Sequence, residues 1–148
     1  QGKFLRRAAG LSFADSPAIR SHAKKMIEDL DIRCTGPEQK VRRLSGGNQQ
    51  KVCIAGALTL EPDLLFVSEP TRGIDIGAKE LVLALLRRLN AEQNVTVVVT
   101  SSELAELRSI CDRIVVIYKG QVAGIVPWDV SNTEIGLLMS GETKGEAA

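Results

Sequence analysis

Apolar residues recur at helical spacing in the first part of the chain. Between residues 16 and 32 they stand three or four positions apart, which predicts a helix with one apolar face. These positions are Ile19, Ala23, Met26, Ile27 and Leu30. Ser16 is suited to cap this helix and Pro17 to occupy its first position. We therefore predict that the first forty-odd residues are helical and polar, up to a turn at Pro37.

Short, uninterrupted apolar runs follow, and they predict strands that are buried on both faces. Residues 64–67 (LLFV) and 95–101 (VTVVVTS) have this form, and the second run is rich in β-branched residues. Helices are predicted beside them at residues 47–60, at 77–90 with a stripe of three leucines, and at 102–111 behind a serine cap. The stripe consists of Leu81, Leu85 and Leu89, and the cap is Ser101 or Ser102. This order of strand, helix, strand and helix predicts a parallel, doubly wound sheet.

The last part of the chain reads as a hairpin and a short helix. Residues 113–127 form two apolar runs around Lys119-Gly120, which predicts two paired strands. Ser131 and Glu134 then have the spacing of a capping box before a last helix. The polar tail from Gly141 onward is expected to be loose.

Composition narrows the possible functions. The chain has 148 residues, 44% of them hydrophobic and 25% charged, which suits one packed domain or one and a half. Aromatic residues make up only 3% and the net charge is +1, so neither a base-stacking surface nor an electrostatic footprint for DNA or an acidic membrane is expected. Three scattered cysteines, an odd number, argue against a disulfide framework or a zinc site and are expected to be reduced and mostly buried. These are Cys34, Cys53 and Cys111.

Targeting signals are not visible in the sequence. No apolar run approaches the length of a transmembrane helix, and no signal peptide is recognised. The chain begins at Gln1 rather than at a methionine, and we expect it to be an excised piece of a longer polypeptide.

The stretch LSGGNQQK, residues 44–51, is built like a phosphate-binding helix start. A helix N-terminus presents unpaired N–H groups and a partial positive charge, and the glycines Gly46 and Gly47 let an anion approach the backbone. Ser45 can either cap the helix or donate to a phosphate oxygen. With Asn48 next to them, these residues on their own are equally compatible with an ordinary capped helix after a Gly-Gly turn.

Glu69 stands directly behind the run at residues 64–67. Ligands of open α/β sheets bind at the carboxyl ends of strands, where a carboxylate can orient and polarise a water for attack on a terminal phosphate. Taken alone, Glu69 is at least as compatible with a surface glutamate in a turn.

Three segments in this order, LSGGNQQK, LLFVSEPTRGIDIGAK and VVVTSSELAEL, resemble the ABC-transporter ATPases over nearly the whole chain, residues 1 to about 141. The wording GGNQQK, EPTRGID and SSEL is typical of the C-terminal cassette of proteins that power sugar importers of the ribose, galactose and xylose type. The resemblance implies a fold of the α/β class, a partial P-loop NTPase (RecA-like) parallel sheet with helices on both faces plus an α-helical subdomain.

The resemblance also implies roles for particular residues. Ser45, Gly46, Gly47 and Asn48 match the signature motif, which binds nucleotide. Residues 64–69 match the Walker B strand, with Glu69 as the catalytic glutamate. The remaining matches are Asp75 in the D-loop, Ser101 at the switch position, where most of the family has histidine, and Ser68 at the Mg²⁺-binding position.

Two of these positions depart from the family pattern. Ser68 replaces the aspartate that holds Mg²⁺ through water, and a neutral hydroxyl attracts the metal less. Ser101 replaces a donor to the terminal phosphate, although serine is usual in this branch. Together they predict a weakened hydrolytic site.

The phosphate loop, G-x-x-x-x-G-K-[ST], is not found in these residues, since the one Gly-Lys pair, Gly2-Lys3, is followed by Phe4. In the family two ATPase domains meet head to tail, and the signature of one covers the ATP bound by the other. The resemblance thus implies ATP and Mg²⁺ as cofactors of the intact parent and a second cassette as partner. It also implies a membrane-spanning permease contacted by the helical subdomain, and indirectly a sugar-binding protein. The parent would be an ATPase on the cytoplasmic, inner face of the cell membrane, whereas this chain alone is expected to be inactive.

The expected division is a helical subdomain at residues 1–50, the C-terminal part of the ATPase core at 51–127, and a helix with a loose tail at 128–148. One alternative is a non-hydrolytic dimerisation module or truncated gene product of the same family. Another is a DNA-repair or chromosome-maintenance ATPase, in which a long coiled coil precedes the signature. No sustained heptads occur here, so that alternative is disfavoured.

Overall fold

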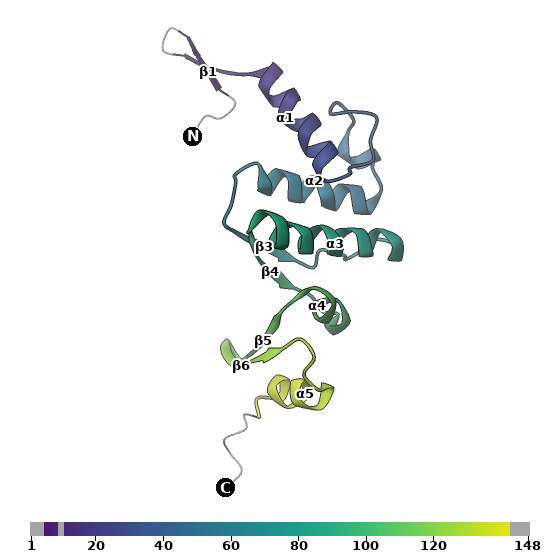
Figure 1. Cartoon of the computed structure of the whole chain (residues 1–148), viewed down its shortest axis with the longest axis vertical. Coiled ribbons are helices and arrows are strands. Elements are labelled where there is room, and N and C mark those ends of the chain that lie inside the picture. The colour runs from purple at the N-terminus through teal and green to yellow at the C-terminus, as the bar shows by residue number, and fades with distance from the viewer. Residues whose placement is uncertain (1–4, 9–10, 143–148) are drawn as a thin grey trace. The chain divides into compact units, whose positions relative to one another are not determined.

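The computed structural model describes residues 5–8 and 11–142, with side chains from residue 14 onward. Figure 1 shows the order of its helices and strands along the chain. The chain divides into two compact units, Gln1–Asp63 with Thr71–Leu85 and Leu64–Pro70 with Leu86–Ala148. None of the helices in the described residues is long and apolar enough to cross a membrane.

The first described residues of the first unit form two paired strands, where the sequence predicts helix. Strands β1 (Leu5–Ala8) and β2 (Leu11–Ala14) pair antiparallel, with Leu5 opposite Ala14 and Ala8 opposite Leu11 (Figure 1). The helical prediction is wrong for these residues. Two four-residue strands contain too few positions for a period of two to be distinguished from other patterns.

Helix α1 (Ser16–Asp29) follows with Pro17 in its first turn, as predicted. Its cap is Asp15 rather than Ser16, because the Asp15 side chain accepts a 3.2 Å hydrogen bond from the Ala18 amide. No residue of α1 is buried, and Ile19 on the predicted apolar face is 42% exposed.

The rest of the first unit carries its buried side chains. A short 3-10 helix, η1 (Val41–Arg43), precedes α2 (Gly46–Leu58), and the unit also holds the start of α3 (Ile76–Gln93). The buried apolar residues of this unit are Leu30, Ile32, Ile54, Ala55, Val82, Leu83 and Leu85.

The second unit contains the predicted parallel strands. β3 (Leu64–Ser68) and β4 (Thr96–Thr100) pair in parallel, in a register that sets Phe66 beside Val98. α3 lies between them in the chain, so the strand–helix–strand order and the parallel pairing are confirmed. Burial on both faces is not, because Phe66 is 71% and Val98 38% exposed. Among the described residues β3 and β4 form a two-stranded sheet, which leaves that face open.

The stripe on α3 is shifted from the predicted one. Val82, Leu85, Leu86 and Leu89 are buried and stand three or four residues apart, whereas Leu81 is 49% exposed.

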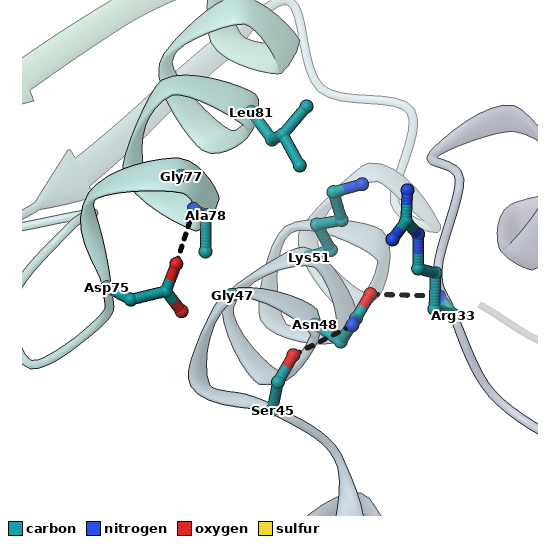
Figure 2. Close-up of a pocket in the computed structure, with 9 residues that line it drawn as sticks. All are labelled: Arg33, Ser45, Gly47, Asn48, Lys51, Asp75, Gly77, Ala78 and Leu81. Carbon is teal, nitrogen blue, oxygen red and sulfur yellow. Dashed lines mark hydrogen bonds between the residues drawn. The ribbon is translucent and has the colours of Figure 1, made fainter.

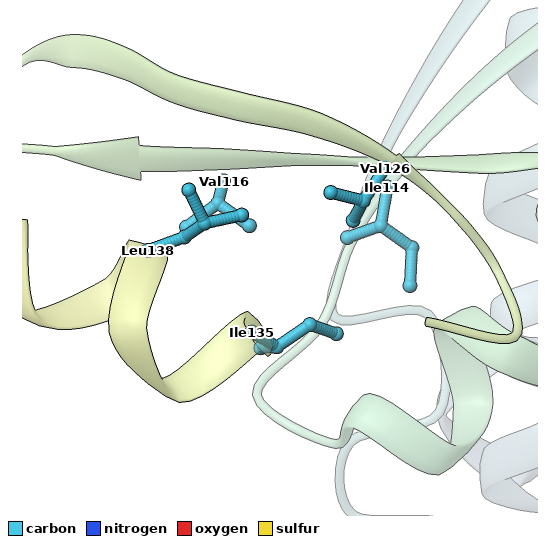
Figure 3. Packing of buried hydrophobic residues seen from close by; sticks show 5 residues of the cluster. All are labelled: Ile114, Val116, Val126, Ile135 and Leu138. Atoms are coloured by element: carbon cyan, nitrogen blue, oxygen red, sulfur yellow. The ribbon is translucent and has the colours of Figure 1, made fainter. Parts of the chain in front are cut away.

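The C-terminal part has a core of its own. Helix α4 (Leu104–Ile110) leads to β5 (Arg113–Tyr118) and β6 (Gln121–Pro127), which form the predicted hairpin, and then to α5 (Asn132–Ser140). The turn has positive φ at Lys119 (47°) and Gly120 (79°), as tight hairpin turns require. Figure 3 shows α5 packed on the strands through a cluster of Ile114, Val116, Val126, Ile135 and Leu138.

Two predicted caps have different outcomes in this region. The Ser131 hydroxyl accepts a 3.1 Å hydrogen bond from the Glu134 amide at the start of α5, which confirms that cap. Helix α4 is instead preceded by Glu103, so neither Ser101 nor Ser102 occupies its cap position.

Candidate functional site

The first turn of α2 has backbone amide groups that can bind a ligand. Ser45 is the N-cap residue in extended conformation, and its side chain makes no capping hydrogen bond. The first bond of the helix runs from the Gln49 amide to the Ser45 carbonyl at 2.9 Å. The amides of Gly46, Gly47 and Asn48 precede that bond and are the donors that a helix leaves without an intrahelical partner. This arrangement suits an anion.

A pocket of about 360 Å³ lies beside this helix start, within the first unit. Figure 2 shows residues of α2 on one side and the start of α3 on the other, with Arg33 at the edge. The pocket is lined by Arg33, Ser45, Gly47, Asn48, Lys51, Asp75, Gly77, Ala78 and Leu81. Of the five residues predicted for nucleotide contact or for the D-loop, four line this pocket, namely Ser45, Gly47, Asn48 and Asp75. The fifth, Gly46, is the first residue of α2 and is not among the lining residues.

The two glycines of the helix start have a packing role. A Cβ on Gly46 would stand 2.7 Å from Ile74 Cγ2, and a Cβ on Gly47 would stand 2.6 Å from Ala78 Cβ. Both contacts are far shorter than carbon atoms tolerate. The close approach of α2 to the segment from Ile74 to Ala78 therefore requires glycine at both positions, independently of any phosphate.

Asp75 starts α3. Its carboxylate accepts a 2.9 Å hydrogen bond from the Ala78 amide, and its carbonyl accepts one at 2.9 Å from Lys79. The aspartate predicted for the D-loop is thus an N-cap in this structure, and it lines the pocket.

Two side chains of α2 hold the segment that follows α1. Lys51, only 6% exposed, donates from Nζ to the Asp31 carbonyl at 2.7 Å and lies 3.6 Å from its carboxylate. Asn48 Oδ1 accepts a 2.8 Å hydrogen bond from the Arg33 amide. Asp31 has a positive φ of 48°, which is unfavourable for a residue with a Cβ. Sequence reasoning singled out neither Lys51 nor Arg33, since neither pairing leaves a trace in local spacing.

The carboxyl ends of β3 and β4 carry a second group of polar residues, in the second unit. Glu69 follows β3 with a positive φ of 47°, and such strained residues concentrate at functional sites. Its two carboxylate oxygens accept hydrogen bonds from the Ser102 amide at 2.8 Å and the Ser102 hydroxyl at 3.2 Å. The carboxylate is therefore held in one orientation at the strand ends.

Ser101, the predicted switch residue, turns the other way. Its hydroxyl donates to Glu106 at 2.7 Å and accepts from the Glu103 amide at 3.0 Å. Glu106 is only 3% exposed. Ser102, which the sequence analysis considered only as a helix cap, is the serine that reaches Glu69. Hydroxyls are common and carry no periodicity, so the choice between neighbouring serines needed coordinates.

The oxygen atoms at these strand ends fit Mg²⁺ poorly. Ser68 Oγ accepts a 2.9 Å hydrogen bond from the Thr100 hydroxyl, and the carboxylate of Glu69, the next residue in the sequence, accepts hydrogen bonds from Ser102. No cluster of three or more histidine, cysteine, aspartate or glutamate side chains suited to a metal occurs among the described residues. Mg²⁺ favours charged carboxylates together with substrate phosphates and water.

Comparison with known proteins shows what the chain is similar to. A family model described as ABC transporter matches residues 6–72, which include the helix start and Glu69. The nucleoside import ATP-binding protein NupA of Lactococcus lactis subsp. cremoris is 45% identical over 130 residues, 87% of this chain and 26% of that protein. The ribose import ATP-binding protein RbsA of Caldanaerobacter subterraneus subsp. tengcongensis is 44% identical over 119 residues, 80% of this chain and 24% of that protein.

The chain resembles the ATP-binding proteins of ABC transporters over most of its length. It spans about a quarter of the length of the curated relatives that it matches. A solved structure of the ATP-binding cassette MJ0796, a dimer bound to ADP and Pi, has 28% identity and a TM-score of 0.65, covering 85% of this chain and 52% of that one. A putative metal-chelate type ABC transporter has a TM-score of 0.75 at 24% identity, covering 88% of this chain and 51% of that one, and supports the ABC ATPase fold alone.

Proposed function

We propose that residues 45–48 of this chain bind the terminal phosphate of an ATP molecule that a second cassette holds. The observation that carries the proposal is the helix start itself. It has unpaired first-turn amides, a serine hydroxyl that makes no cap bond, and a pocket beside it. A site of this kind needs no lysine of its own, because the helix start supplies the positive end of a dipole. ATP would then join two cassettes, and its hydrolysis would release them.

The second part of the proposal concerns the transported molecule and the partners. The relatives are named as import proteins for ribose and for nucleosides. We propose that the parent protein powers uptake of a sugar or a sugar-containing compound, with a permease contacted by residues 1–50, and indirectly a sugar-binding protein. Its place is then the cytoplasmic face of the membrane.

The third part is a weakened hydrolytic site at the strand ends. Glu69 is the proposed catalytic base, held by Ser102, and Ser68 stands at the metal position with a neutral hydroxyl. We expect Ser68→Asp to raise ATP turnover of the parent protein, because a carboxylate restores the charge that attracts Mg²⁺. Unchanged turnover, with Mg²⁺ varied over a wide range, would contradict this part.

An association assay tests the main proposal. This chain is mixed with a separate ABC cassette that carries a phosphate loop and a glutamine in place of its catalytic glutamate, and complex formation is measured with and without ATP. We expect a complex only with ATP, and weakening about tenfold in Ser45→Ala from loss of one hydrogen bond to a charged phosphate. Ser140→Ala is the control, since that hydroxyl bonds the Leu137 carbonyl at the end of α5.

The alternative of a non-hydrolytic dimerisation module gives a different result in the same assay. The neutral Ser68–Thr100 pair favours it, because it supplies no charge for a metal. A complex that forms equally well without ATP would support that alternative and contradict phosphate binding at the helix start.

A further inference from the structure

Asn48 is matched to the nucleotide-binding motif, but both ends of its side chain are already engaged within the protein. Oδ1 accepts the Arg33 amide at 2.8 Å, and Nδ2 donates to Ser45 Oγ at 2.8 Å. The backbone amide of Arg33 can only donate, so the Asn48 atom facing it must be the oxygen. The orientation of the amide group, and with it the donor toward Ser45, follows from this bond.

The bond from Asn48 decides what the Ser45 hydroxyl can do. A hydroxyl has one hydrogen and two lone pairs, and Nδ2 occupies a lone pair. The single hydrogen of Ser45 therefore remains to be donated. Ser45 is exposed, lines the pocket and makes no cap bond, so that hydrogen is available for donation to a group bound in the pocket.

We propose that Asn48 is a positioning residue rather than a nucleotide ligand: through it, the Arg33 amide commits the Ser45 hydroxyl to donate into the phosphate site. This inference rests on the proposed function, and it assigns the role of one residue within that site. Figure 2 shows the chain of bonds from Arg33 through Asn48 to Ser45. Hydrogen bonds in such a chain polarise one another, which makes the last donor stronger.

The relay also connects the phosphate site to the segment after α1. Lys51, one turn further along α2, fixes the Asp31 carbonyl at 2.7 Å, so two side chains of α2 hold residues 31–33 in place. If that segment moves away from α2, the hydrogen bond from the Arg33 amide to Asn48 Oδ1 is broken, and the Ser45 hydroxyl is no longer held in one direction. The site then responds to the position of the segment without any change in the residues that touch phosphate.

A double-mutant cycle in the association assay tests the relay. The variants are Ser45→Ala, Asn48→Ala and both together, measured as the ATP concentration that gives half-maximal complex with the phosphate-loop cassette. We expect each single variant to weaken the complex about tenfold. The double variant should be no weaker than Ser45→Ala within about twofold, because residues that act through one another are not additive.

Four outcomes would overturn the relay. A double variant whose loss is the product of the two single losses would mean that Asn48 touches the nucleotide itself. An Asn48→Ala variant that binds like wild type would show that Ser45 needs no positioning. In both cases the response to Ser45→Ala would leave the proposed function standing. Wild-type chain that forms no ATP-dependent complex, or a complex that Ser45→Ala leaves unchanged, would refute the proposed function and the relay together.

Amide hydrogen exchange on this chain alone gives a second measurement, independent of a partner. Asn48→Ala removes the acceptor of the Arg33 amide, so that amide should exchange at least about tenfold faster. Asn48→Asp retains an acceptor there and should keep the amide protected, although it can no longer donate to Ser45. Fast exchange of the Arg33 amide in the wild-type chain, or unchanged exchange in Asn48→Ala, would contradict the first bond of the relay.

Discussion

Replacing Gly47 by alanine should destabilise the protein through a clash between two helices. The added Cβ would lie 2.6 Å from the Cβ and 3.5 Å from the Cα of Ala78. Carbon atoms in contact prefer about 3.5–4.0 Å, so the overlap is about 1 Å, and a small, stiff neighbour cannot rotate away. Overpacking of this size costs about 1–3 kcal/mol. With a urea m-value of about 2 kcal/mol/M, the midpoint of unfolding should fall by about 1 M.

Gly56 provides the matched control on the same helix. It is exposed, and a Cβ there would meet nothing within 4 Å. Gly56→Ala should therefore raise the free energy of unfolding by about 0.5–1 kcal/mol, the usual gain in helix propensity. Ala78→Gly in the Gly47→Ala background should recover much of the loss, since it removes the atom in conflict. If Gly47→Ala unfolds at the same urea concentration as wild type or higher, the close approach of α2 and α3 is wrong.

Three further predictions concern other bonds. Asp75→Ala should lower the free energy of unfolding in urea by about 1 kcal/mol because the N-cap of α3 is lost, whereas Asp75→Asn should lower it by only about 0.3 kcal/mol. Equal losses in the two variants would contradict the capping role of Asp75. Ser101→Ala should lower the free energy of unfolding by about 1–3 kcal/mol because it removes a donor to the buried Glu106. Ser102→Ala should lower it by less than about 1 kcal/mol because that hydroxyl is exposed. If thermal unfolding shows the reverse order, the hydrogen bonds assigned to the two serines are wrong. Burial, together with the charge of Asp112, raises the pKa of the Cys111 thiol above the ordinary value of 9.0. The stability that the protonated Cys111 thiol contributes is fully present below pH 9.0 and is lost as the pH rises through the raised pKa. The free energy of unfolding in urea should therefore be lower at about pH 10 than at about pH 8, and Cys111→Ser should lack this decrease. The same decrease in both proteins would show that the Cys111 thiol does not cause it.

The elements of the core could be predicted because their signals are local and repeated. A few neighbouring residues determine each of these signals: the apolar runs that form β3 and β4, the serine cap at Ser131 and the turn at Lys119-Gly120. Prediction failed where the outcome depends on what covers a surface. Phe66 reads as buried in the sequence and is 71% exposed, and Cys53 is exposed where burial was expected.

The sequence analysis proposed residues for the candidate site but not the hydrogen bonds that they make. The sequence motifs led to Ser45, Asn48, Glu69 and Asp75, and the chain is similar to proteins of the family that these motifs indicated. Their hydrogen-bond partners lie as many as 33 residues away, as for Glu69 with Ser102. Such pairings are decided by the path of the chain in space, which spacing along the sequence does not encode.

The contact between Gly47 and Ala78 has a consequence for tracing how proteins of this kind change over time. In a descendant that no longer used ATP, selection for phosphate binding would be lost, but selection for correct packing of the protein interior would continue. Substitution of Gly47 would still produce a clash with α3, and selection would still remove the substitution. Retention of the glycine pair is therefore poor proof that a descendant is active, and the exposed serine beside it is the more informative residue to follow.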